Sequence, residues 1–123
     1  MRPLFFIILC LVNHVAAAQQ KTYGMADFSA SEGRAFVIIT KVRETISLSD
    51  LQAGQLAKIA GEYSDGLQQL NGAKNYEEKL AKLLAKRDQK TLEVLKDPEL
   101  STSYQKKFDS TLAAQNTGYG RRR

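Results

Sequence analysis

The chain has 123 residues, of which 43% are hydrophobic and 25% are charged, as expected for a single small domain. Its formal net charge is +5, and three of the positive charges are Arg121, Arg122 and Arg123 at the end of the chain. The remainder is therefore close to neutral, and the charge gives little reason to expect a nucleic-acid partner.

The N-terminal residues have the pattern of a cleavable secretion signal. Arg2 supplies a positive start, residues 4–12 form an apolar run, and alanines at 16–18 give a small-residue cleavage site before Gln19. The run is shorter than the roughly 20 residues that a membrane-spanning helix needs. Cys10 lies inside the run rather than after it, which argues against a lipid anchor. The sequence thus predicts a signal peptide at residues 1–18 and an exported protein, either periplasmic or secreted.

Cleavage at this site removes the only cysteine and the only histidine, Cys10 and His14. The mature chain then lacks the usual ligands of transition metals and the partners of Ser-His or Cys-His catalysis. The carboxylate pairs that remain are Glu62 with Asp65 and Glu77 with Glu78. Each pair falls on a helix face that we expect to be solvated. The sequence therefore predicts no enzyme, no cofactor and no metal site.

Four segments between residues 29 and 114 have helical periodicity, after a flexible lead at 19–28 and before a flexible basic tail at 115–123. In the first, residues 31–46, Ser29 and Glu32 have the spacing of a capping box. Its apolar residues on one helix face are Ala35, Ile39, Val42 and Ile46. The β-branched run 37–40 could also form a strand, but no second strand candidate exists to pair with it.

The second segment begins with another capping box, Ser49 with Gln52, and ends at Asn71 and Gly72. Its apolar stripe consists of Leu56, Ile59, Tyr63, Leu67 and Leu70. Glycines 54 and 61 share a neighbouring face. Because glycine costs about 1 kcal/mol in a helix relative to alanine, they indicate either a close helix neighbour or simply a weak helix.

The third segment, residues 75–96, is rich in Ala, Leu, Lys and Glu, which favour helices. Asp97 caps the fourth, and Pro98 takes the first-turn position where its missing amide proton costs nothing. The sequence therefore predicts an all-α fold of four amphipathic helices in a hairpin-like or open bundle arrangement. The pattern leaves open whether the helices close into a compact bundle.

Basic residues form a stripe along the third helix, consisting of Lys79, Lys82, Lys86 and Lys90, with Arg87 beside it. Such a stripe could bind an acidic partner or lipid head groups. The i,i+4 pair of Glu78 and Lys82 favours the other interpretation, an ordinary solvated face. Contact with a membrane is expected to be peripheral at most.

The tail allows one other interpretation. Residues 119–122 could be a processing and amidation signal of a peptide precursor. No series of dibasic sites frames short peptides in this chain, so we disfavour a precursor.

Leu48, Ser49 and Gln52 occupy the three fixed positions of a Leu-Thr-x-x-Gln motif, with serine in place of threonine. Residues 95–100 resemble a degenerate second copy in which Asp97 replaces threonine and Pro98 follows. These motifs and the order of the helices resemble the Spy/CpxP-like periplasmic proteins. The resemblance covers residues 29–114.

Membership of that family would imply a helical hairpin that pairs into a cradle-shaped homodimer. It would also imply a role in envelope stress, namely ATP-independent binding of unfolded proteins or of a stress-sensor domain. The alternative is a structural or adaptor domain that docks one specific envelope partner through the lysine stripe.

Overall fold

The computed structural model describes residues 23–121. They form a short 3₁₀ turn, η1 (Met25–Asp27), and the helices α2 (Ala30–Val42), α3 (Asp50–Gln69), α4 (Tyr76–Leu95) and α5 (Pro98–Arg121), without a strand in that range. The predicted all-α class with four helices is confirmed. The predicted signal peptide, residues 19–22 of the lead, and Arg122 and Arg123 lie outside the described residues.

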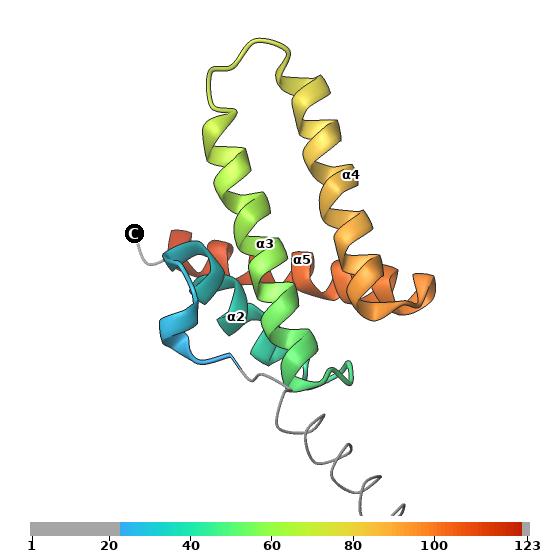
Figure 1. The fold of residues 1–123 in the computed structure, drawn as a ribbon. Helices are drawn as coiled ribbons and strands as arrows, with labels where there is room; N and C mark the ends of the chain where they lie inside the picture. Colours follow the sequence, from blue (N-terminus) through green and yellow to red (C-terminus); the bar gives the residue numbers. More distant parts are fainter. Residues whose placement is uncertain (1–22, 122–123) are drawn as a thin grey trace, which may run out of the picture.

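The four helices form an open arrangement rather than a closed bundle. Helices α3 and α4 run antiparallel as a hairpin that rises from a base formed by α2 and α5 (Figure 1). Helix α2 packs along α3 as far as Asp65, and α5 crosses the foot of the hairpin and contacts both α2 and α4. This arrangement falls within the predicted hairpin-like or open bundle.

The hydrophobic core lies in the base. Its buried residues come from α2, the loop before α3, the first half of α3, the end of α4 and α5: Ala35, Ile38, Ile39, Val42, Leu48, Ala53, Leu56, Ala57, Leu95, Tyr104 and Phe108. Burying a large apolar side chain contributes about 1.5–3 kcal/mol, so this cluster is the main source of stability.

Both predicted capping boxes are present. At α3, the backbone N–H of Gln52 donates to Ser49 Oγ at 3.0 Å, and that of Ser49 donates to Gln52 Oε1 at 3.0 Å. Ser29 and Glu32 form the same reciprocal pair at α2. These bonds satisfy amides that have no partner inside the helix, which explains why both helices begin where the sequence predicts.

Two predicted helix boundaries are wrong. The first helix ends at Val42, not Ile46, because the chain must turn at 43–46 before α3 begins. Arg43 holds this turn by donating to the Leu48 carbonyl at 2.9 Å and to Asp50 at 3.0 Å. At the other end, α5 continues to Arg121 instead of ending near Ala114. The predicted flexible tail contains Gly118 and Gly120, but glycine costs only about 1 kcal/mol in a helix.

The described part of the predicted flexible lead, residues 23–28, packs against the helical body. The Tyr23 and Phe28 rings stack with centroids 5.8 Å apart, and Phe28 contacts Phe36 of α2 at 5.1 Å. Lys58 of α3 donates to the Asp27 carbonyl at 3.0 Å and lies over the Tyr23 and Phe28 rings. These contacts join the segment to the base.

Candidate functional site

The four lysines of the predicted stripe lie along α4, and most have acidic neighbours. Lys86 and Lys90 both pair with Glu62 of α3, at 2.8 and 3.0 Å. Lys82 pairs with Glu78 at 3.8 Å, while Lys79 is exposed. The hydrogen bond from Lys86, and to a smaller extent that from Lys90, lowers the pKa of Glu62. Part of the stripe's charge is therefore used to join α3 to α4.

Arg87 differs from the lysines because its side chain turns inward. It is 12% exposed and pairs with Asp88 at 3.1 Å and with Asp109 of α5 at 3.8 Å. Its guanidinium lies 4.7 Å from the centroid of the Tyr63 ring. Arg87 thus connects α4 with α3 and α5 at the foot of the hairpin.

The residues of the predicted family motif all act at helix starts. Leu48 is buried in the core, and Ser49 and Gln52 form the capping box of α3. Asp97 Oδ1 accepts hydrogen bonds from the backbone N–H groups of Glu99 and Leu100, at 2.9 and 3.3 Å. Pro98 is the first residue of α5. The structure gives every motif position a role in folding.

The two members of the predicted pair Glu62 and Asp65 contact different partners, and those of the pair Glu77 and Glu78 are exposed. Asp65 accepts a hydrogen bond from Ser31 of α2 at 2.6 Å, whereas Glu62 contacts the lysines on α4. Glu77 and Glu78 are exposed on the first turn of α4.

No group of three His, Cys, Asp or Glu side chains that could hold a metal ion exists in the described chain. Within residues 23–121, no helix combines the length and apolar character needed to cross a bilayer.

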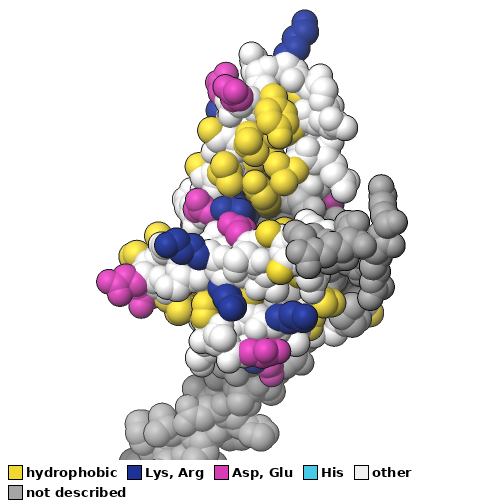
Figure 2. Space-filling model, turned by 180° about the vertical axis from the view of Figure 1, so that it is seen from behind, with side chains coloured by type: hydrophobic (Ala, Val, Ile, Leu, Met, Phe, Trp, Pro, Cys, Tyr) yellow, Lys and Arg dark blue, Asp and Glu magenta, His cyan; other side chains and the backbone are white. Residues whose placement is uncertain are grey.

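Apolar side chains are incompletely covered on the outer hairpin, defined as residues 63–84. Leu70 is the one buried side chain in that range. The large apolar residues that remain part-buried or exposed are Tyr63, Leu67, Tyr76, Leu80, Leu83 and Leu84. Hydrophobic side chains gather on this part of the molecule in Figure 2. The outer hairpin therefore presents apolar surface to its surroundings.

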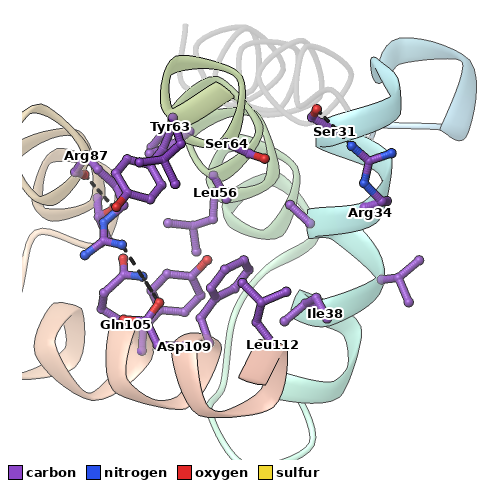
Figure 3. Close-up of a pocket in the computed structure, with 18 of the residues that line it drawn as sticks. Ser31, Arg34, Ile38, Leu56, Tyr63, Ser64, Arg87, Gln105, Asp109 and Leu112 are labelled. Atoms are coloured by element: carbon purple, nitrogen blue, oxygen red, sulfur yellow. Dashed lines mark hydrogen bonds and ion pairs between the residues drawn. The ribbon is translucent and has the colours of Figure 1, made fainter. Parts of the chain in front are cut away.

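A cavity of about 440 Å³ lies in the base, between α3 and α5. Its lining is mostly apolar and includes Ile38 of α2, Leu56 of α3 and Phe108 of α5. Polar groups lie on two opposite sides: Ser31 and Arg34 on the α2 side, and Arg87 and Asp109 on the other (Figure 3). The sequence pattern predicted many of these residues as core and gave no sign of the cavity, because the lining comes from four helices.

Comparison with protein-family models, with curated proteins and with solved structures finds no match to this chain. The resemblance to the Spy/CpxP-like proteins therefore rests on the motif residues and the helix order alone.

Proposed function

We propose that this chain is an exported, non-enzymatic helical protein of the Spy/CpxP-like type, which binds partly unfolded proteins without ATP. The proposal joins the predicted signal peptide at residues 1–18 with the apolar surface of the outer hairpin. A binding role of this kind needs no cofactor, because affinity comes from burying apolar surface.

The outer hairpin is the observation that carries the proposal. Two helices packed side by side cover each other along one seam. In the described chain, α2 and α5 reach only the first residues of the outer hairpin, at Asp65 and at the cavity beside Tyr63 and Leu67. Tyr76 is 46% exposed, and Leu80 follows it one turn later on the same face. Contiguous exposed apolar surface marks sites for partners, and unfolded chains offer matching apolar segments.

The alternative, an adaptor that docks one envelope partner through the lysine stripe, has weaker support. Lys86 and Lys90 share the carboxylate of Glu62, and Lys82 lies beside Glu78. An acidic partner would have to compete with these contacts. The stripe therefore offers less free positive charge than the sequence suggests.

Aggregation of several unrelated unfolded proteins in the presence of the purified chain tests the proposal. We expect suppression by the unchanged protein and weaker suppression by Leu80→Asn. Leu92→Asn is the matched control, since Leu92 is an exposed leucine of α4 outside the outer hairpin. Failure to suppress any aggregation would refute the proposal. Salt-sensitive binding to one partner, lost on reversing the charges of Lys82 and Lys86, would support the adaptor instead.

The mass of the protein in solution tests the homodimer that the family resemblance implies. A dimer that dissociates in Leu80→Asn but not in Leu92→Asn would place the contact between copies on the outer hairpin. A strict monomer would contradict the cradle-shaped dimer.

A further inference from the structure

The cavity between α3 and α5 has the size of a small-molecule site. Its volume of about 440 Å³ lies within the roughly 300–1,000 Å³ common for ligand pockets. A helix about 10 Å wide fills roughly 420 Å³ in each turn, so the cavity takes no more than about one turn of a bound helix. At about 30 Å³ for each water-sized group, it holds roughly fifteen non-hydrogen atoms. A small molecule fits these dimensions better than a protein segment.

Tyr104 of α5 supplies a buried polar group to the cavity. Its side chain is 2% exposed and lines the cavity, yet its hydroxyl makes no hydrogen bond to any residue that the structure describes. Every fully enclosed side-chain nitrogen or oxygen in the described chain has a partner, so this hydroxyl is not fully enclosed, and the cavity is the space that Tyr104 lines. Burial raises the pKa of Tyr104, which keeps the hydroxyl protonated and able to donate.

Arg34 places a positive charge on the α2 side of the cavity. Its side chain is exposed and donates to Ser31 Oγ at 3.2 Å. Among the side chains that the structure describes, no carboxylate lies within ion-pairing distance of Arg34. The other arginine of the cavity, Arg87, already pairs with Asp88 and Asp109. Arg34 is therefore the cation available to an anionic head group.

The Tyr104 hydroxyl and the Arg34 guanidinium lie toward opposite sides of the cavity. The charged groups that act on Tyr104 are Arg87 and Asp109, and both lie across the cavity from Arg34 in Figure 3. Between the two sides, the lining is formed by apolar side chains such as Ile38, Leu56 and Phe108. A ligand that satisfies both sides needs an anionic group at one end, an apolar body and a second oxygen toward the other end.

We propose that the cavity binds a medium-chain aliphatic carboxylic acid that carries a hydroxyl or carbonyl oxygen near its far end. The carboxylate pairs with Arg34, the chain packs on the apolar lining, and the distal oxygen accepts a hydrogen bond from Tyr104. A twelve-carbon hydroxy acid has about the number of atoms that the volume allows. This site goes beyond the proposed protein-binding role and does not depend on it.

Calorimetric titration of the purified protein with 12-hydroxydodecanoate, below its aggregation concentration, tests the site. We expect saturable binding of one molecule per chain. Arg34→Gln should weaken it roughly tenfold, because a charge-assisted hydrogen bond is lost. The matched control is Lys41→Gln, an exposed cation of the same helix outside the cavity, which should bind as the unchanged protein does.

Two further variants separate the parts of the site. Tyr104→Phe should weaken 12-hydroxydodecanoate about fivefold and leave dodecanoate unchanged, since only the hydroxy acid has an oxygen for Tyr104. Ala60→Leu, which adds volume to the lining, should abolish binding of both acids while circular dichroism shows the helices intact. Absence of saturable binding, or equal affinity in Arg34→Gln and Lys41→Gln, would overturn the proposal. Leu80→Asn lies outside the cavity and should bind both acids normally, which separates this site from the outer hairpin.

Discussion

Gly61 of α3 lies against Glu32 in the first turn of α2, with no room for a side chain at residue 61. A Cβ atom there would approach the Glu32 backbone nitrogen and Cα to 2.8 Å. The two helices therefore meet backbone to backbone at this point. This contact confirms at Gly61 the close helix neighbour that the glycines of the second helix indicated. At Gly54 the close neighbour is instead the ring of Tyr23, which lies outside any helix.

Gly61→Ala should lower the free energy of unfolding by about 1–2 kcal/mol. Alanine favours the helix by about 1 kcal/mol, but overpacking against a backbone that cannot swing away costs about 1–3 kcal/mol. Urea denaturation measures the difference. Gly66→Ala is the control, because its Cβ would meet only the terminal methyls of Leu83, at 2.8 and 3.1 Å. If both variants are equally stable, the approach at Glu32 is looser than described.

Arg87→Ala should destabilise the protein by about 1–2 kcal/mol, because it removes the stack on Tyr63 and the packing of a long side chain. Lys79→Ala should change stability by less than about 0.5 kcal/mol, since Lys79 is exposed on the same helix. Thermal unfolding of the two variants, compared at the same pH, checks the contrast. Similar stability in both would mean that Arg87 does not hold the foot of the hairpin.

Ser49→Ala should cost about 1 kcal/mol by removing the oxygen that caps α3. In a domain of this size, such a loss lowers Tm by about 4–8 °C. Ser47→Ala serves as the control, because Ser47 is exposed and precedes the helix. An unchanged Tm in Ser49→Ala would show that water replaces the cap at no cost.

Glu62→Gln should make stability less dependent on pH. The pKa of Glu62 is lowered from its ordinary value of 4.5 by Lys86 and Lys90, so the ionised carboxylate stabilises the folded state. That contribution is present above pH 4.5 and is lost as pH falls through the lower, folded-state value. The Tm of Glu62→Gln should thus fall below that of the unchanged protein at pH 7, and the difference should shrink as the pH falls below 4.5.

The effect of Glu62→Gln should be small, because the carboxylate is about half exposed and solvent screens such pairs. Glu77→Gln is the control: Glu77 is exposed, and the described chain shows no ion pair for it. A pH-independent difference between Glu62→Gln and the unchanged protein would contradict the assignment.

The starts of α2 and α5 could be predicted more accurately than their ends. Ser29, Ser49 and Asp97 carry local signals, since a cap bonds to amides only two or three residues away. The helix ends at Val42 and Arg121 depend on contacts with residues farther along the chain or on small differences in helix propensity. The turn after α2 is held by Arg43 reaching to Leu48 and Asp50, a contact that no periodicity reveals.

The candidate sites were less predictable because they depend on how the helices cross. The spacing of Lys86 and Lys90 predicts a shared face of α4, but nothing in it shows that Glu62 of α3 lies opposite. Tyr104, Phe108 and Leu112 are spaced by four residues, which predicts one apolar face of α5, and Tyr104 is indeed buried. Its unbonded hydroxyl appears only once α3 and α5 are placed with a cavity between them.

The contrast between the buried base and the thinly covered outer hairpin has a kinetic consequence. Amides between Tyr63 and Leu84 should exchange with solvent through local opening, whereas amides beside Ile39 and Leu56 should exchange only when the whole domain unfolds. The hairpin tip can then fray and reclose many times while the base stays intact. The outer hairpin could thus adjust its shape to a bound chain while the helices of the base keep their packing.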